Sequence, residues 1–211
     1  MGRWEPNARG RLSEAAMSLF QEKGYDRTTV EDIAARAGLT ERTFFRYFTD
    51  KREVLFGGSD DLHKLIVTTI AEAPQGTAPL DVVAAALEAM APVFKDRRDH
   101  ARARQALLVA YAELRERELI KLASLASAAA GALRERGVTE PEASLAAEAG
   151  IAVFKVAFER WLEDPKAQDL ARHIRAGLDA LKAITASMDT AAPTATPRQP
   201  VRPARAKAPR R

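Results

Sequence analysis

The chain has 211 residues, 46% of them hydrophobic and 29% charged, with a net charge of +4 and no cysteine. This length supports one or two domains, and the lack of cysteine excludes disulfides, zinc–thiolate sites and thiol nucleophiles. Residues 1–55 carry ten Lys/Arg against nine Asp/Glu, residues 56–188 carry seventeen against nineteen, and residues 189–211 carry six against one. Because the positive charge is concentrated in the tail, nucleic-acid binding by the first segment depends on where its charges point.

The sequence also argues against a metal centre, a membrane span and export. His63, His100 and His173 are far apart and form no metal-binding pattern. No uncharged run reaches the roughly 20 residues that cross a bilayer, and the N-terminus lacks the apolar core of a signal peptide. We expect a cytoplasmic protein without a metal or cofactor.

Residues 8–23 are predicted to form the first helix. Its apolar residues recur at intervals of three and four, as on one face of an amphipathic helix: Leu12, Ala15, Ala16, Leu19 and Phe20. Gly24 should end this helix, and Tyr25 should pack back against its apolar face.

Residues 28–51, TTVEDIAARAGLTERTFFRYFTDK, predict two short helices joined by a three-residue turn. The apolar face of the first of them comprises Val30, Ile33, Ala34 and Ala37. Gly38 suits the left-handed conformation that ends a helix, and Thr40 is a good N-cap for the next one. At the start of the pair, Thr28 and Glu31 fit a capping box, with Thr29 and Asp32 as a looser version. The exposed N–H groups there are suited to a phosphate.

The second short helix has two faces of different character. Phe44 and Phe48 are four residues apart and should both point inward, which leaves Arg42, Thr43, Arg46 and Tyr47 mostly on the other faces. Two short helices at a steep angle, the second with basic, hydroxyl and aromatic groups outward, predict a helix-turn-helix.

Five further helical stretches are predicted downstream. Their approximate ranges are 51–71, 80–94 with a kink or early stop at Pro92, 98–135 with one break, 141–163 beginning at Pro141, and 167–188. The charged segment 96–104 should lie at the surface, and Gly137 should close the long stretch. From Thr190 onward the chain is rich in proline and basic residues and cannot bury a core, so it is predicted to be disordered.

The fold class is therefore all-α, with no strand pattern and no internal repeat. The predicted organisation is a three-helix helix-turn-helix DNA-binding domain over residues 8–51, a helical effector-binding and dimerisation domain over 52–188, and a basic Pro/Ala-rich tail over 189–211.

Residues 28–51, together with RLSEAAMSLFQEKGYDRTT before them and REVL after them, resemble the N-terminal signature of TetR/AcrR-type transcriptional regulators. The resemblance covers about the first quarter of the chain. It implies a dimer in which the second motif helix enters the major groove. Arg42, Thr43 and Arg46 then become candidate base or phosphate contacts, whereas Thr28, Thr29, Thr40, Tyr47 and Lys51 become candidate backbone contacts.

Phe45 departs from the family pattern, because many members carry a tyrosine there whose hydroxyl meets a phosphate. Phe45 cannot donate a hydrogen bond, so we expect it to pack on a sugar or a thymine methyl group, with the phenol of Tyr47 nearby.

Two downstream helices are candidates for a dimer interface. Residues 141–163 are apolar or small on nearly all sides, so this helix needs cover on two faces, and Gly150 permits close helix approach. The resemblance implies a four-helix bundle from two such helices per subunit. The candidate interface residues are Leu145, Ala149, Ala152, Val153, Val156, Ile174, Gly177, Leu178 and Leu181. The alternative is that both helices only bury the core of one monomer.

The resemblance also implies a ligand cavity among the middle helices. Its candidate lining is Met90, Phe94, His100, Leu108, Tyr111, Phe154, Phe158 and Trp161. Large apolar residues at helical spacing are equally compatible with a plain core, whereas the polar tips of Tyr111 and His100 would orient a ligand. Little charge interrupts the apolar helices, which favours a lipophilic effector.

The predicted function is a ligand-responsive, dimeric repressor that leaves a near-palindromic operator on binding its effector. An alternative is a helical scaffold protein whose basic tail binds DNA without sequence preference. An enzyme is not expected, because the chain has no nucleophile elbow, H-E-x-x-H, phosphate-loop or Rossmann glycine pattern.

Overall fold

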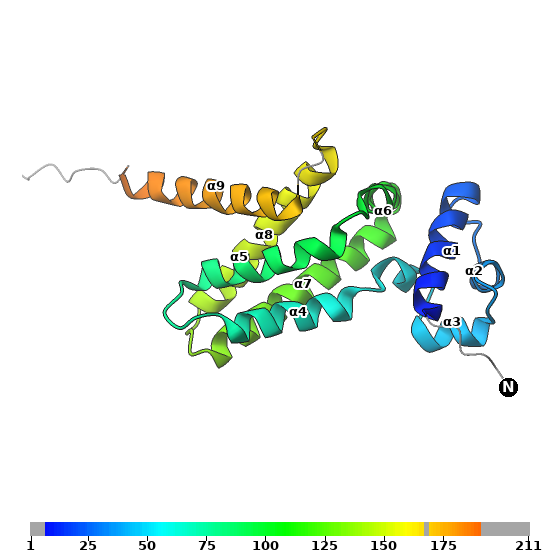
Figure 1. Cartoon of the computed structure of the whole chain (residues 1–211), viewed down its shortest axis with the longest axis horizontal. Helices are drawn as coiled ribbons and strands as arrows, with labels where there is room; N and C mark the ends of the chain where they lie inside the picture. Colours follow the sequence, from blue (N-terminus) through cyan, green and yellow to red (C-terminus); the bar gives the residue numbers. More distant parts are fainter. Residues whose placement is uncertain (1–6, 167–168, 191–211) are drawn as a thin grey trace, which may run out of the picture.

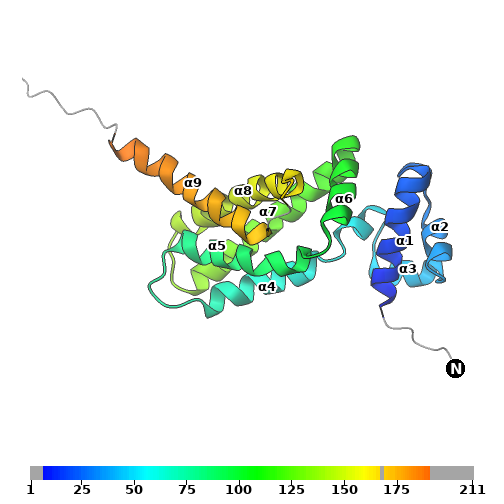
Figure 2. The same ribbon diagram turned by 45° about the horizontal axis from the view of Figure 1, so that its top comes forward.

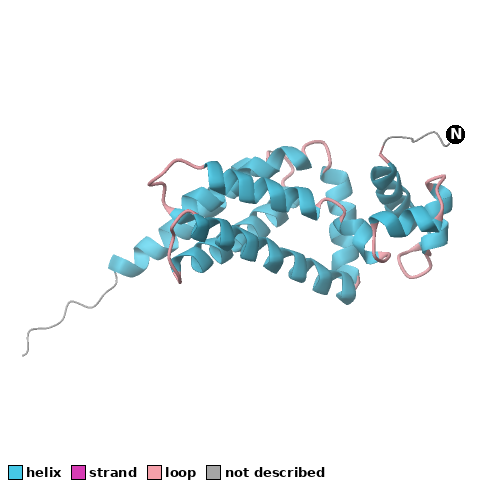
Figure 3. Ribbon diagram, turned by 90° about the horizontal axis from the view of Figure 1, so that it is seen from below, coloured by secondary structure: helices cyan, strands magenta, loops and turns pink. Residues whose placement is uncertain are grey.

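The computed structural model describes residues 7–166 and 169–190, and every regular element in these ranges is a helix (Figure 3). This confirms the all-α prediction. The predicted disorder beyond Thr190 concerns residues outside the described ranges. Within those ranges, no helix combines the length and hydrophobicity that a bilayer crossing requires, and no three His, Asp or Glu side chains are grouped to hold a metal ion.

Three helices form a small unit at one end of the molecule (Figure 1). They are α1 (Ala8–Lys23), α2 (Val30–Arg36) and α3 (Glu41–Tyr47), and α1 has the predicted bounds. Gly24 ends α1 with φ +86°, and Gly38 has φ +66° in the turn between α2 and α3. Both values lie in the left-handed region that glycine adopts without a steric penalty. The predicted apolar stripe of α1 is buried, and the Tyr25 ring packs against Phe20 with centroids 5.1 Å apart.

Of the two capping boxes predicted at the start of α2, the structure forms the looser one, Thr29 with Asp32. Thr29 is the N-cap: its hydroxyl accepts the Asp32 N–H at 3.1 Å, while the Asp32 carboxylate accepts the Thr29 N–H at 2.8 Å. Thr28 is instead buried, because its hydroxyl donates to the Gly24 carbonyl at 2.8 Å and closes the loop before α2.

The connection to the body is broken where one continuous helix was predicted. A 3-10 helix, η1 (Arg52–Phe56), is followed by Gly57 and Gly58 and then by α4 (Ser59–Glu72). The side chains of Val54, Leu55 and Phe56 are buried. The short helix η1 therefore seats the three-helix unit on the body.

The described part of the body consists of α4, five further α-helices and one 3-10 helix. These are α5 (Pro79–Met90), η2 (Ala91–Phe94), α6 (Arg98–Ala110), α7 (Ala112–Glu135), α8 (Glu142–Glu163) and α9 (Leu170–Thr190). The early stop before Pro92 and the single break in the long stretch, at Tyr111, are as predicted. Helix α9 ends two residues beyond its predicted end. Figures 1 and 2 show α6 between α1 and the rest of the body, and α9 at the opposite end.

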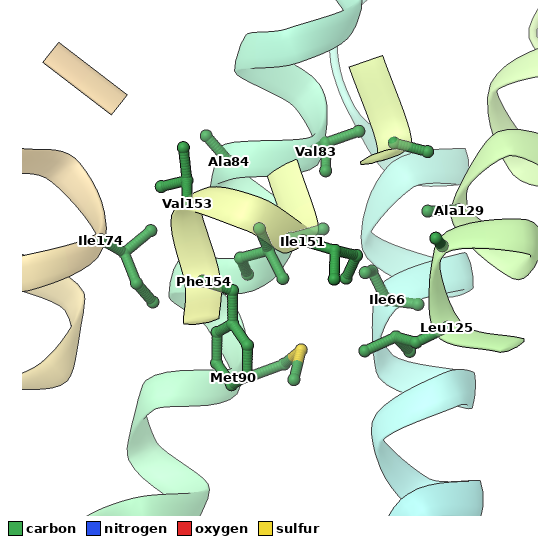
Figure 4. Close-up of a cluster of buried hydrophobic side chains, with 14 of the residues drawn as sticks. Ile66, Val83, Ala84, Met90, Leu125, Ala129, Ile151, Val153, Phe154 and Ile174 are labelled. Atoms are coloured by element: carbon green, nitrogen blue, oxygen red, sulfur yellow. The ribbon is translucent and has the colours of Figure 1, made fainter. Parts of the chain in front are cut away.

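The body has its own hydrophobic core, shown in Figure 4. Ile66 of α4, Met90 of α5, Leu125 of α7, Ile151 of α8 and Ile174 of α9 all contribute buried side chains to it. A second core lies in the three-helix unit, and Leu108 of α6 and Leu114 of α7 complete it. The two units therefore share a packed boundary.

Gly150 allows a close helix contact, but within one subunit. A Cβ placed on Gly150 would lie 2.4 Å from Cγ1 of Val83 in α5. The sequence predicted that Gly150 allows two helices to approach closely without saying which two. In the structure they are α5 and α8.

We expect Gly150→Ala to lower the free energy of unfolding by about 1–3 kcal/mol, because Val83 is β-branched and fully buried and cannot move aside cheaply. Gly131 in α7 is the matched control, because its added Cβ would meet nothing closer than 3.8 Å. Gly131→Ala should be stabilising by roughly 0.5–1 kcal/mol. Urea denaturation of both variants measures the difference, and equal effects would contradict this packing.

Candidate functional site

Helix α3 has polar and aromatic side chains on its outer side and buried phenylalanine rings on its inner side. Phe44 is fully buried and Phe48 nearly so, with ring centroids 5.4 Å apart, as the sequence predicted. Arg42, Phe45 and Arg46 are exposed on the helix, and Thr43 is half-buried. Thr40 caps α3, since its hydroxyl accepts the Thr43 N–H at 3.2 Å. The buried phenylalanines thus set which side chains of α3 face outward.

The arginines of α3 differ electrostatically from other basic residues of the three-helix unit. Arg36 pairs with Glu22 at 2.7 Å, Lys23 with Asp32 at 2.6 Å, and Arg52 with Asp50 at 2.8 Å. Hydrogen bonds from Arg36 and then Ser18 lower the pKa of Glu22 to about 2.

Among the described residues, the Arg42 side chain makes no hydrogen bond or ion pair. Arg46 stacks on the ring of Tyr47, with its guanidinium carbon 4.9 Å from the ring centroid, and donates to the Tyr47 hydroxyl at 3.2 Å. An arginine held against an aromatic ring is partly pre-organised for a further partner. Two guanidinium groups are thereby placed on the outer surface of α3.

Phe45 is 54% exposed, with its ring edge-on to Phe44. An exposed phenylalanine on a seven-residue helix is a group available for apolar contact rather than for hydrogen bonding. The contact of Phe45 with a sugar or a thymine methyl group stays a prediction, and the exposed ring is accessible for it.

Two of the residues predicted to contact the DNA backbone, Thr28 and Lys51, form hydrogen bonds within the protein instead. Thr28 is 1% exposed, so its buried hydroxyl cannot reach a phosphate in this conformation, and its assignment as a contact residue is corrected to a structural one. Lys51 donates to the carbonyls of Tyr25 at 2.8 Å and Thr28 at 3.1 Å, and its Nζ lies 4.0 Å from the centroid of the Tyr25 ring. Burial lowers the pKa of Lys51. Lys51 therefore fastens η1 to the loop before α2.

Thr29 and Thr40 are exposed at the N-termini of α2 and α3. At α2 the Asp32 carboxylate already receives hydrogen bonds from Thr29 and the ion pair from Lys23. A phosphate approaching this terminus would meet a carboxylate, which disfavours it. In the part of the chain that the structure describes, no acidic side chain is bonded to Thr40, and its hydroxyl lies 3.0 Å from that of Thr43. Of the two, Thr40 is the better-placed predicted phosphate contact.

A cavity of about 270 Å³ lies between α4, α6, α7, α8 and η2. Five of the predicted lining residues face it: Met90, Phe94, His100, Phe154 and Phe158. Other lining residues were not predicted from the sequence. Most are polar or charged and lie at helix positions that spacing alone does not distinguish from solvent-facing ones, and Leu55 lies in η1. They include Leu55, His63, Arg97, Arg104, Glu118 and Lys155.

Three predicted lining residues belong elsewhere. Leu108 is buried in the core of the three-helix unit, and the Tyr111 ring lies 4.9 Å from that of Tyr25. Both are on the end of α6 that faces α1, away from the cavity. Trp161 packs behind the lining, with its ring 5.3 Å from Phe158 and the Arg98 guanidinium over its face. The segment 96–104 is also not simply solvated, since Arg98 and Arg102 donate to the Leu162 carbonyl.

The candidate interface residues divide into an outward and an inward set. Leu145 is 65% and Val156 47% exposed, and Ala149 and Ala152 lie between them on the same face of α8. Val153, Ile174 and Leu178 are instead buried in the core of the same subunit, while Gly177 and Leu181 pack at its edge. Val153, Ile174 and Leu178 therefore pack within one subunit, whereas Gly177 and Leu181 are only partly buried and stay predicted interface residues.

The outward face of α9 carries small and apolar residues that the sequence analysis did not single out. Ala176 and Ala180 are exposed, and Ile184 is 63% exposed. The signal available in the sequence was their spacing of four, on the side opposite the Ile174–Leu178 stripe. These residues of α9, together with the exposed Leu145 and Val156 of α8, are called here the α8–α9 face.

Comparison with known proteins gives matches along most of the chain. A family model described as "Bacterial regulatory proteins, tetR family" matches residues 12–56, and a model of the MftR C-terminal domain matches residues 77–186. The HTH-type transcriptional regulator TcmR of Streptomyces glaucescens is 33% identical over 88 residues, which is 42% of this chain and 39% of TcmR. The uncharacterized regulator YvkB of Bacillus subtilis is 45% identical over 42 residues, 20% of this chain and 22% of YvkB. The matches thus span well under half the length of these curated relatives.

Solved structures share the fold over a longer range. SmeT in complex with triclosan aligns with a TM-score of 0.57 and 23% identity, covering 84% of this chain and 90% of SmeT; SmeT is the repressor of a multidrug efflux pump of Stenotrophomonas maltophilia. The fatty acid degradation regulator FadR of Bacillus halodurans aligns with a TM-score of 0.59 and 19% identity, covering 85% and 96%. At these identities the likeness establishes the fold, with an N-terminal helix-turn-helix and a helical body.

Proposed function

The chain belongs to the TetR family of DNA-binding transcriptional regulators, and we propose that it acts in the bacterial cytoplasm as a dimeric repressor, released from a near-palindromic operator by a small lipophilic ligand. The proposal rests mainly on the exposed side chains of the outer surface of α3. Arg42 and Arg46 lie there on a helix whose opposite side is sealed by Phe44 and Phe48.

The chemistry of these side chains suits the major groove. An arginine guanidinium can bridge O6 and N7 of a guanine, whereas contacts to phosphates set the register of the protein on the duplex. Thr40, Thr43 and Tyr47 are positioned around the arginines as hydroxyl donors for phosphates. Phe45 is available for a thymine methyl group.

The α8–α9 face supports a dimer. Leu145, Ala149, Ala152 and Val156 are spaced by four, three and four residues, which is the seam spacing of helices that pack side by side. With Ala180 and Ile184 of α9, they would form a four-helix contact with a second copy. One α3 contacts only a few base pairs, and a two-fold dimer doubles the site and makes it a near-palindrome.

The cavity supports release by a ligand. It lies between the body helices and η1, so an occupant that favours one arrangement of these elements also favours one arrangement of the two α3 helices. Its wall of Met90, Phe94, Phe154 and Phe158 suits a lipophilic molecule.

The test is a footprint on DNA upstream of the coding sequence, at physiological salt and with excess non-specific competitor. The proposal predicts a protected near-palindrome, and this protection should persist in a chain lacking residues 191–211. Binding that competitor abolishes, or that disappears with those residues, would support the alternative of non-specific binding through the basic tail.

A further inference from the structure

The cavity proposed above to hold the effector has both apolar and charged side chains in its lining. The apolar lining includes Leu62, Met90, Phe94, Phe154 and Phe158. The charged or titratable lining comprises Arg97, His100 and Arg104 from the α6 segment, His63 from α4, Glu118 and Lys121 from α7, and Lys155 and Glu159 from α8. Such a lining is suited to a molecule with a hydrocarbon part and a polar end.

The basic groups of α6 form a row along the cavity. Arg97, His100 and Arg104 are separated by three and four residues, so they lie on one face of the helix, and all three line the cavity. The side chains of Arg97 and Lys155 make no hydrogen bond or ion pair within the described part of the chain, whereas Arg104 pairs with Glu118 at 2.9 Å and Lys121 with Glu53 at 3.0 Å. The side chain of Glu159 is likewise unpaired in the described structure, so two unpaired positive charges, those of Arg97 and Lys155, face one unpaired negative charge in the lining.

The local field agrees with this arrangement. Partial burial is the largest cause that lowers the pKa of His100, and the positive charges of Arg97 and Arg104 lower it further. The negative charge of Glu14 in α1 acts in the opposite direction. Burial disfavours any charge, but the contribution of Arg97 and Arg104 to this shift is the one that favours an anion beside His100.

Arg104 links this basic row to the DNA-binding unit. Its Nε donates to the Leu55 carbonyl in η1 at 2.9 Å, and its guanidinium carbon lies 4.8 Å from the centroid of the Phe56 ring. Helix η1 is the segment that joins α3 to α4. A carboxylate is a stronger partner for a guanidinium than a backbone carbonyl is, because the hydrogen bond is charge-assisted on both sides.

Resting on the proposed function, we infer that the effector is an amphipathic carboxylate, whose acid group binds Arg97, His100 and Arg104 and whose hydrocarbon part packs against the apolar lining. The acid group competes with the Leu55 carbonyl for Arg104 and so loosens η1. The cavity volume of about 270 Å³ favours a single short or medium chain over a large conjugate.

Calorimetric titration of the full chain without DNA tests the ligand chemistry. The probes are straight-chain carboxylates from hexanoate to dodecanoate, with the alcohols and amines of equal length as neutral and cationic matches. At least one carboxylate should bind about tenfold or more tightly than its alcohol, and the amine should bind most weakly. Equal binding of acid and alcohol, or no binding by any carboxylate, would overturn the inference.

Variants assign the acid group to the basic row. Arg97→Gln should weaken carboxylate binding about tenfold and leave alcohol binding unchanged, since the Arg97 side chain has no partner within the described structure that its loss would expose. Arg115→Gln removes the same charge from an exposed position outside the cavity lining and should change neither. If Arg97→Gln weakens acid and alcohol equally, or if Arg115→Gln matches it, the basic row is not the acid site.

The pH profile is a second readout. A bound carboxylate raises the pKa of the neighbouring His100, so binding takes up a proton, and carboxylate affinity should increase from pH 8 to pH 6. Alcohol affinity should stay constant, and His100→Gln should flatten the carboxylate profile. A flat profile in the unaltered chain would contradict the placement of the acid beside His100.

The two proposals fail in different ways. If carboxylates bind as described but leave the operator footprint intact, release by this ligand is wrong and the ligand chemistry stands. If the footprint is present and carboxylates bind no better than alcohols, the regulator stands and the carboxylate inference is wrong.

Discussion

Replacing Arg42 and Arg46 together by alanine is expected to weaken binding to the operator on the order of a hundredfold or more, because each guanidinium in a bidentate base contact is worth about 1–3 kcal/mol. The stability of the chain should not change, since Arg42 is exposed without a protein partner in the described structure and Arg46 lies on the surface of the Tyr47 ring. Titration of labelled operator DNA at fixed salt measures the loss, and urea denaturation confirms that the fold persists.

The matched control is Lys64→Ala with Arg115→Ala. This pair removes two positive charges from exposed positions on α4 and α7, away from α3. It should reduce affinity only slightly, through the net charge. If the control pair weakens operator binding as much as the α3 pair, the binding is a property of overall charge. If the α3 pair binds like the unaltered chain, the assignment of α3 as the contact helix is wrong.

Replacing Leu145 and Val156 together by glutamate is expected to give a monomer at micromolar concentration. Both side chains are exposed on the α8–α9 face, so the substitutions leave the core of the subunit intact and place four like charges in a two-fold interface. Because a monomer contacts only one half-site, operator affinity should also fall on the order of a hundredfold or more, as half of the contacts are lost. Sedimentation velocity and operator titration measure the two effects.

Val109 and Ile120 supply the control for this experiment. They are 67% and 51% exposed on α6 and α7, outside the α8–α9 face. Val109→Glu with Ile120→Glu makes a comparable change in charge and hydrophobicity and should leave the dimer unchanged. A Leu145/Val156 variant that still sediments as a dimer would show that the α8–α9 face is not the interface.

Local structure was largely predictable from the sequence. The bounds of α1, the turn at Gly38, the cap at Thr40 and the inward placement of Phe44 and Phe48 depend on neighbouring residues only, and all agree with the structure. The sequence left two capping boxes possible, because Thr28 and Thr29 both have an acidic residue three positions later, and the structure forms the one at Thr29. The hydrogen bond from Thr28 to the Gly24 carbonyl, which a local pattern does not contain, decides between them.

The packing of the helices against one another was harder to predict from the sequence, because the same apolar periodicity fits a helix face that turns toward its own core and one that turns outward. The stripe of Ile174 and Leu178 was a candidate for the dimer interface or for the core of one subunit, and the structure places it in the core. Leu108 and Tyr111 were assigned to the cavity, although the length of α6 carries them to the boundary with α1. The basic cavity residues Arg97 and Arg104 could not be distinguished from solvated charges, since that distinction depends on helices far away in the sequence.

The most direct test of the central claim, that two copies of α3 contact one DNA site, is selection of binding sites from random double-stranded DNA. The unaltered chain should enrich one motif composed of two inverted half-sites at fixed spacing, and the Arg42→Ala/Arg46→Ala variant should enrich none. Absence of any motif, a single unrepeated half-site, or the same motif from the variant would contradict the account.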